Sequence, residues 1–572
     1  MKSTAPIINA LEESSANGLL LRCIASLCRR VRRIELHALV SNLNNSGKIT
    51  VCSPATQVEI GGLDHNDFWS VFGVLDKVIP VIKSTASELV PFLRKVMERA
   101  GSDGASGRPN IWLGKWCEAN KDGAQEIIRK ARDGDCQYCA VCKWALQGLG
   151  DIDLALELTK NSLNEIRIAG IESLELIQGL PEEIAMKSID RCVDVVSTEM
   201  NLDFRIAAIH AVFGLWSRNE TLYNYRQDEL LDGVLESPAP KESQALAVCV
   251  FYYHKLINPT TLTKILNALC GELENPEAVI RCIDGALDSG DPKWDSGAVF
   301  RVFASSLKKL DKQAKDIDVH GFTQYVIGNP RHQSKLFSSW LTKGDPELCS
   351  FLGRMVSRLA AGALPVNIDR EDLPASAEDQ IFMSRKCIGF LFTHEIMVAS
   401  ILLAVVKNGK KEARAEAERL LVDPMLLSYG GKLREFLEGM KGCGSRRVDG
   451  CIARLLKYHD VYLERLEEAS RLEEMKPSLD RRRASALKRR EMNRQIQKEA
   501  YEKSPLLQLF PQSVLLYGKK SFSIVTQQDG KRVPSVNPLS MYSYSAELPR
   551  LLAVDPVGLD QRLAIYRLEK RS

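Results

Sequence analysis

The chain has 572 residues, 45% of them hydrophobic, which is enough apolar material for several domains or one long repeat array and excludes a disordered chain. Its 77 Lys and Arg against 73 Asp and Glu leave a formal charge of +4, so global charge does not mark the whole chain as nucleic-acid-binding. Fifteen cysteines, an odd number without a secretory leader, predict reduced thiols and a cytoplasmic location rather than a disulfide scaffold.

Residues 1–100 are predicted to form a mostly helical N-terminal region. Apolar residues recur at helical spacing over 18–40, which predicts one amphipathic helix. Its arginines lie largely off the apolar stripe and form a small basic face (Arg22, Arg29, Arg30, Arg33). The β-branched residues of 48–60 predict a small hairpin around Ser53-Pro54. The Gly- and Ser-rich stretch 101–110 has little to bury, and we expect a domain boundary there.

Residues 111–360 show helical segments of moderate length, each ended by Gly, Pro, Asn or Asp. Segments within this region resemble one another at intervals of roughly 30 to 40 residues, the range of helix-pair repeats. The five copies are QYCAVCKWALQGL (137–149), EIRIAGIESLELI (165–177), DFRIAAIHAVFGL (203–215), QALAVCVFYYHKL (244–256) and EAVIRCIDGALDS (277–289).

Small residues recur in these copies at two positions three residues apart. The first position holds Cys142, Gly170, Ala208 and Cys282, and the second holds Ala145, Ser173, Ala211 and Gly285. The fourth copy departs, with Val248 and Phe251. Small side chains three apart lie on one helix face and let a neighbouring helix approach closely.

The pattern resembles HEAT-type repeats, including the short variety with Gly-Asp after the second helix (LQGLGD, ending at Asp151). The resemblance implies an all-α fold, an α-solenoid of stacked helical hairpins, whose concave face holds a protein or nucleic-acid partner. It implies no chemistry, and therefore no catalytic residue or cofactor.

The stretch DCQYCAVCKW, 135–144, places three cysteines at the spacing of a metal or iron–sulfur site. With Asp135 as N-cap we expect one helix to Leu149, on which Cys136, Cys139 and Cys142 spread over about 120° and climb roughly 9 Å. That is too dispersed to hold one ion, so we predict helix packing and no metal site. Cys139 is expected nearest the surface and is the one thiol of the three worth testing for reactivity.

A connection is predicted at 360–380, followed by a C-terminal helical region, 376–503. The apolar stretch 387–406 is about long enough to span a bilayer, but His394 and Glu395 near its middle favour a buried helix, so no membrane span is expected. A long helix is predicted from Asp449 to Met475, stopped by Pro477. The tail, 504–572, is predicted to be a small mixed α/β element with a hairpin around Gly518.

The segment 481–503 concentrates the basic charge of the chain, with nine Lys or Arg against three Glu. As a helix it has only a thin apolar stripe and cannot be deeply buried. It is the candidate phosphate-backbone contact, with an acidic protein or plain solvent as alternatives. The candidate nucleic-acid-binding residues are Arg481, Arg482, Arg483, Lys488, Arg489, Arg490, Arg494 and Lys498.

Other motifs give no catalytic assignment. No phosphate-binding Gly-Lys-Ser/Thr loop and no Gly-x-Ser-x-Gly elbow occur. His394 is predicted to be a core histidine. Two weak clusters have no predicted geometry: His320 and His332 with Asp316 and Asp318, and Cys443 with Cys451.

Three functions remain open from the sequence. The leading one is a non-enzymatic helical-repeat scaffold or adaptor that binds a macromolecular partner, with a basic C-terminal helix. The second is a nucleic-acid-binding subunit of a larger machine, in repair or in defence against foreign DNA. The third is a HEAT-like nucleic-acid-modifying enzyme, resembling some DNA-alkylation glycosylases, with Trp112, Trp116, Trp144 and Trp216 in its cleft, although such tryptophans are more often core.

Overall fold

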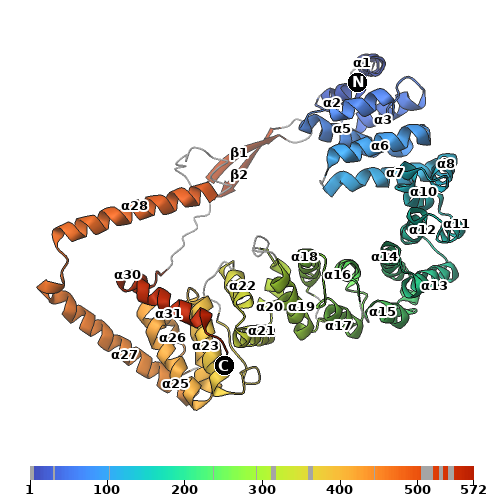
Figure 1. The fold of residues 1–572 in the computed structure, drawn as a ribbon. Coiled ribbons are helices and arrows are strands. Elements are labelled where there is room, and N and C mark those ends of the chain that lie inside the picture. Colours follow the sequence, from blue (N-terminus) through green and yellow to red (C-terminus); the bar gives the residue numbers. More distant parts are fainter. Residues whose placement is uncertain are drawn as a thin grey trace. The chain divides into compact units, whose positions relative to one another are not determined.

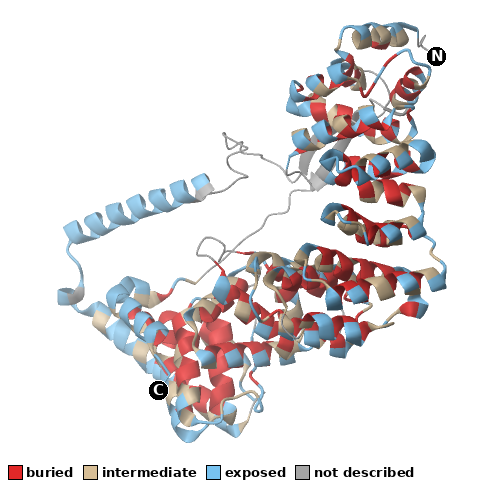
Figure 2. Cartoon of the chain, turned by 45° about the vertical axis from the view of Figure 1, so that its right-hand side comes forward, coloured by how far each residue is buried: buried red, intermediate tan, exposed pale blue. Residues whose placement is uncertain are grey.

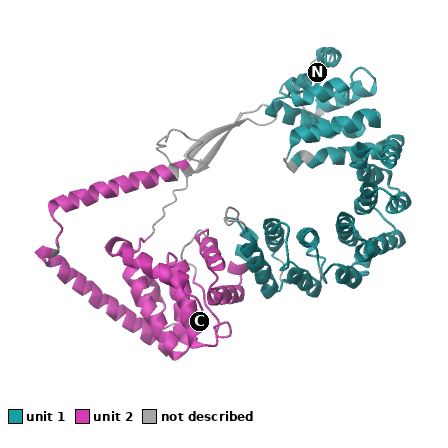
Figure 3. Ribbon diagram, in the orientation of Figure 1, with its two compact units in different colours: residues 1–325 teal, residues 326–572 magenta. Residues whose placement is uncertain are grey.

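The computed structural model describes residues 5–29, 33–101, 104–235, 238–290, 293–310, 317–358, 365–442, 445–503, 520–526, 532–538 and 547–571. Apart from one pair of strands, the regular elements in these ranges are helices, so the chain belongs to the all-α class. It divides into two compact units, residues 1–325 and 326–572 (Figure 3).

The first unit begins with a packed group of helices whose core extends from Leu11 to Ala169. The core is continuous across 101–110, so the boundary predicted there does not separate two compact units. The elements are α1 Ala5–Ala16, α2 Leu20–Cys28, α3 Arg33–Asn45, α4 Pro54–Gly61, α5 His65–Val78, η1 Ile79–Val81, α6 Ala86–Ala100 and η2 Gly104–Gly107.

Two predictions for this region are wrong. The helix predicted over 18–40 is two helices, since α2 ends at Cys28 and α3 begins at Arg33. The predicted hairpin at 48–60 is a helix, α4. Ser53 caps its N-terminus by accepting from the Thr56 amide, and Pro54 occupies the first helical position, where proline costs no hydrogen bond. These local signals outweigh the β-branched composition.

The remaining helices of the first unit carry the repeats (Figure 1). They are α7 Arg108–Ala119, α8 Lys121–Arg132, α9 Cys136–Cys139, α10 Cys142–Leu149, α11 Ile152–Leu158, α12 Asn164–Leu176, α13 Glu182–Thr198, α14 Leu202–Arg218, η3 Glu220–Leu222, α15 Gln227–Leu235, α16 Pro240–Tyr253, α17 Pro259–Ala268, α18 Pro276–Leu287, α19 Ser296–Lys309 and α20 His320–Ile327.

The five similar segments pack against one another in sequence order. α10 contacts α12, α12 contacts α14, α14 contacts α16, and α16 contacts α18. The alternating helices α11, α13, α15 and α17 form a second series of neighbours. The small positions explain the close packing: a Cβ added to Gly170 would lie 2.8 Å from the carbonyl oxygen of Ala155 in α11. The repeat pattern therefore corresponds to a repeated packing arrangement.

The fourth copy keeps the small buried position, one residue later than predicted. Cys249 is fully buried, whereas Val248 is half-buried. The second position, three residues after Cys249, holds the exposed Tyr252, and this is the departure of the fourth copy. The ring of the neighbouring Phe251 lies over Gly285 of α18, so that a Cβ there would be 2.6 Å from the ring. In the first three copies the small residues of both positions are buried.

The second unit contains the remaining elements. They are α21 Pro330–Lys343, α22 Pro346–Ser357, α23 Ala377–Leu391, α24 Glu395–Asn408, α25 Lys411–Leu420, the π-helical turn η5 Leu421–Leu426, α26 Lys432–Gly439, α27 Arg446–Arg471, η6 Glu473–Met475, α28 Leu479–Lys503, strands β1 Lys520–Thr526 and β2 Arg532–Pro538, α30 Arg550–Val554 and α31 Pro556–Leu568. Of these, α23, α25, η5, α26 and α27 pack against the apolar α24.

The apolar stretch 387–406 is buried as predicted, but as two helices. α23 ends at Leu391 and α24 begins at Glu395, with His394 as its N-cap. No helix in the described ranges is long and apolar enough to cross a membrane.

The C-terminal segment docks on the second unit through α31, which packs against α23. Strands β1 and β2 pair antiparallel, with Ser523 opposite Ser535. Gly518, around which the hairpin was predicted, lies outside the described residues, and the two strands are joined further along the chain.

Candidate functional site

The predicted basic segment forms one helix, α28, and every side chain described along it is exposed (Figure 2). All eight candidate residues, Arg481, Arg482, Arg483, Lys488, Arg489, Arg490, Arg494 and Lys498, therefore lie at the surface. The apolar residues are exposed as well: Leu487 retains 65% of its accessible surface. A helix with no buried side chain among those described contributes little packing to the fold, and its residues are available to a partner.

The sequence of α28 suits a helix that stands without tertiary support. It is rich in Ala, Arg, Lys, Glu and Gln, which are strong helix formers, and its 25 residues exceed the length at which isolated helices become marginal. It follows α27, whose first half buries one face and whose Arg454 pairs with Glu418 at 2.7 Å. The helix predicted from Asp449 to Met475 is α27, Arg446–Arg471, so it ends before the position at which Pro477 was expected to stop it, and the short turn η6 lies between them.

Four cations line one face of α28. Arg483, Arg490, Arg494 and Lys498 follow at intervals of seven, four and four residues, which keeps them within about 80° of arc over roughly 22 Å of helix. The other four candidate cations lie on the opposite side of the helix, so α28 is cationic around most of its circumference.

The three cysteines of 135–144 are not gathered into a metal site. No group of three metal-ligating side chains occurs in the described part of the chain. Asp135 caps as predicted, accepting from the Gln137 amide at 3.0 Å, but the helix breaks at Ala140–Val141 into α9 and α10. Cys142 is fully buried in its small position, and burial raises the pKa of its thiol to about 12.

The expectation for Cys139 is wrong. Cys139 is buried, its thiol faces the Ala131 carbonyl at 3.5 Å, and burial raises its pKa. The exposed thiol is Cys136. Because the helix breaks between α9 and α10, the first turn is not in the orientation expected for one continuous helix. Cys136 rather than Cys139 therefore lies at the surface.

The remaining histidine and cysteine candidates give no site. His394 is buried, its Nε2 lies 3.0 Å from the Ser357 hydroxyl, and burial lowers its pKa, as expected of a core histidine. His320 is exposed at the start of α20 and His332 is half-buried in α21. Asp316 and Cys443 lie outside the described residues, and Cys451 is fully buried.

Three of the four tryptophans named for an enzyme cleft are core residues. Trp112, Trp116 and Trp216 are buried, and their indole N–H groups donate to Asp76, to the Ile82 carbonyl and to the Tyr225 carbonyl. Trp144 differs. It is half-buried, and its indole nitrogen is enclosed without a hydrogen-bond partner among the described residues.

Trp144 lies in a groove that the sequence analysis did not identify. Two adjoining cavities of about 450 and 340 Å³ follow α10, α12 and α14, and Lys143, Ile168 and Glu172 line both. We call this surface the α10–α14 groove. Its further lining includes Cys136, Cys139, Glu165, Trp144, Glu175, Asp203, Ile206 and His210.

The groove is built from equivalent positions of the repeat. Trp144, Glu172 and His210 hold the eighth position of the first three copies, and Ile168 and Ile206 hold the fourth position of the second and third. Consecutive packing of α10, α12 and α14 brings these positions side by side. Aligning the outward-facing positions, in addition to the small inward ones, would have indicated the groove from the sequence.

Buried polar contacts fix the floor of the groove. Tyr253 of α16 donates to the Glu175 carboxylate at 3.0 Å, and burial raises the pKa of Glu175. His210 Nδ1 lies 3.6 Å from the Cys249 sulfur. Burial lowers the pKa of His210 and raises that of Cys249, so the pair is a neutral imidazole beside a neutral thiol. It does not have the thiolate–imidazolium character of an activated cysteine nucleophile.

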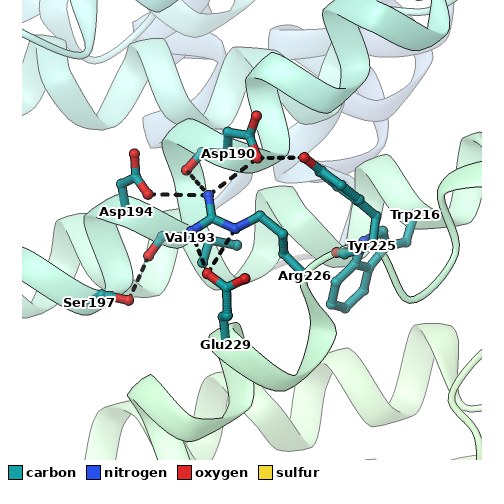
Figure 4. Close-up of polar contacts among 8 residues, drawn as sticks. All are labelled: Asp190, Val193, Asp194, Ser197, Trp216, Tyr225, Arg226 and Glu229. Atoms are coloured by element: carbon teal, nitrogen blue, oxygen red, sulfur yellow. Dashed lines mark hydrogen bonds and ion pairs between the residues drawn. The ribbon is translucent and has the colours of Figure 1, made fainter.

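A second polar cluster, around Arg226, ties the turn before α15 to α13 (Figure 4). The guanidinium contacts Asp190 and Asp194 at 3.2 Å and Glu229 at 2.6 Å. Arg226 has a φ of 53°, an uncommon conformation for a residue other than glycine. Because its hydrogen bonds are satisfied within the cluster, we interpret Arg226 as a structural brace between successive repeats.

No protein-family model matches this chain, and a search of curated proteins finds no significant relative.

Proposed function

We propose that this chain is a helical-repeat scaffold, an α-solenoid of HEAT-like repeats, that binds macromolecular partners and uses α28 as a cationic arm for nucleic acid. The observation that carries the proposal is the exposure of α28, a 25-residue helix with nine Lys or Arg residues, eight of which are the candidate residues. The consecutive packing of five similar helices supports the scaffold. Arrays of this kind form extended binding surfaces because each repeat contacts only its neighbours.

The charge pattern of α28 fits a phosphate backbone. The line Arg483, Arg490, Arg494, Lys498 offers cations over a length comparable to several phosphates of a strand. Each phosphate neutralised releases bound counterions, and this entropy gain drives binding without sequence specificity. We therefore expect α28 to bind nucleic acid through the backbone rather than through base edges.

The test measures how tightly the full chain binds labelled duplex DNA and labelled single-stranded DNA at low salt. Binding is detected by the fluorescence anisotropy of the label. Neutralising one face with Arg483→Gln, Arg490→Gln and Arg494→Gln keeps good helix formers and removes three charges. The matched control changes three exposed lysines of the first unit to Gln: Lys115, Lys187 and Lys264. The proposal predicts loss of affinity in the α28 variant and little change in the control.

Two results would contradict the nucleic-acid role of α28. One is the absence of binding to either DNA at low salt. The other is equal loss in the two triple variants, which would assign binding to net charge alone. A third result would change the partner. If the chain binds polyglutamate more tightly than DNA, and this binding requires the same three arginines, α28 binds an acidic protein instead of nucleic acid.

A further inference from the structure

We propose that the α10–α14 groove binds an extended segment of a partner protein that carries a lysine or arginine flanked by apolar side chains. The inference rests on the scaffold function proposed above and assigns a ligand chemistry to one part of its surface. Shape, charge and one unpaired donor support it.

The shape fits an extended chain. The groove crosses three consecutive helices, and packed helices lie about 8–10 Å apart, so it is roughly 20 Å long. About six residues of extended chain cover that distance. Ile168 and Ile206 are half-buried at equivalent positions along it, which provides apolar contacts at a regular spacing.

The charge selects a cation. Three carboxylates, from Glu165, Glu172 and Asp203, line the groove beside the buried, hydrogen-bonded Glu175, against the single ammonium of Lys143. Lys143 pairs with Glu172 at 2.9 Å and lies over the Trp144 ring, 5.5 Å from its centroid. The groove thus already holds one cation between a carboxylate and an aromatic face, the arrangement that favours Lys and Arg. The excess of carboxylates disfavours a phosphate backbone.

The unpaired donor points to a backbone acceptor. The enclosed indole nitrogen of Trp144 has no acceptor among the described residues. A buried donor without a partner costs free energy, and tryptophan N–H groups are usually paired when buried. The N–H has no surface open to the groove in the free chain, so a backbone carbonyl of an extended peptide satisfies it only when binding turns the indole ring.

The test is selection of randomised peptides displayed on phage against the full chain, followed by affinity measurement with the selected synthetic peptides. We expect the selected sequences to contain a lysine or arginine between apolar residues. Glu172→Gln should weaken them about tenfold or more, since it removes a charge-assisted contact. Trp144→Phe keeps an aromatic ring, removes the N–H, and should weaken them several-fold. Glu183→Gln, an exposed carboxylate on α13, is the matched control and should change nothing.

Each other outcome has a definite meaning. Selected peptides that are acidic, or that ignore both groove variants, overturn the groove assignment and leave the scaffold function standing. If neither peptides nor DNA bind the folded chain, the scaffold function itself is wrong. Circular dichroism melts of each variant separate weakened binding from unfolding, and Trp144→Phe serves as the independent variant if Glu172→Gln is unstable.

Discussion

Tyr253 of α16 donates a hydrogen bond to Glu175 of α12 across the intervening α14, with 3.0 Å between the oxygens. Gly214 of α14 leaves the space for it, because a Cβ there would lie 2.3 Å from the Glu175 Cγ. One contact therefore links three consecutive copies of the repeat. It also fixes Glu175 in the lining of the α10–α14 groove.

Gly214→Ala should destabilise the first unit although alanine is the better helix former. The added methyl overlaps the Glu175 side chain, and overpacking of this kind costs about 1–3 kcal/mol. Urea denaturation of the full chain measures the change. Gly233→Ala in α15 is the control, since its nearest neighbour atom is 3.4 Å away and the substitution should be neutral or stabilising. Equal effects of the two substitutions would contradict the steric role of Gly214.

The stability contribution of Glu175 should depend on pH in a defined direction. Burial raises its pKa above the ordinary value of 4.5, so the folded state holds a proton that the unfolded state releases. Stability is therefore greatest below the unfolded pKa and falls as pH rises through the folded pKa. The Glu175→Gln variant should lack this pH dependence. The difference in free energy of unfolding, variant minus native chain, should therefore increase between pH 4 and pH 7. A constant difference would contradict the buried environment of Glu175.

Glu416 of the second unit should show the opposite dependence. Its carboxylate accepts two hydrogen bonds from Arg419 and one from Arg385, each 2.8 Å long, and these contacts lower its pKa to about 2. The stabilisation is present above the ordinary pKa of 4.5 and is lost as pH falls toward 2. Glu416→Gln should cost about 1–2 kcal/mol at pH 7, allowing for solvent screening, and little at pH 2.5. Equal cost at both pH values would exclude the ionic contribution.

Lys386 should hold the C-terminal helix α31 in place. Its buried ammonium donates to the carbonyls of Arg567 and Glu569, both at 2.7 Å, which satisfies groups left unpaired at the helix end. Lys386→Met should cost about 2–4 kcal/mol and increase hydrogen exchange in α31. Lys407→Met, at an exposed lysine of the same unit, is the control. Unchanged exchange in α31 would show that its other contacts, such as the Arg385–Glu569 ion pair and the packing on α23, hold it without Lys386.

Much of the helical architecture could be predicted from periodicity, because apolar and small residues recur wherever one helix packs on another. The failures have local causes. Ser53 and Pro54 start a helix where β-branched composition predicts strands. The break at Ala140–Val141 exposes Cys136 and buries Cys139, and hydrophobicity alone does not indicate the break at His394.

The candidate site was predictable in part. The exposure of α28 follows from its charge, because no face is apolar enough to bury. The α10–α14 groove was missed because its residues differ in type: Trp144, Glu172 and His210 share a repeat position but no chemistry. Only the packing of consecutive helices brings such residues together.

The most direct test of the account is the salt dependence of DNA binding by the full chain. If the four cations on one face of α28 contact phosphates, the logarithm of the association constant should fall with the logarithm of salt concentration with a slope of about −3 to −4. Neutralising Arg483, Arg490 and Arg494 should bring that slope to about −1. A slope that is unchanged in this variant, or no binding at low salt, would contradict the assignment of α28 as a nucleic-acid-binding arm.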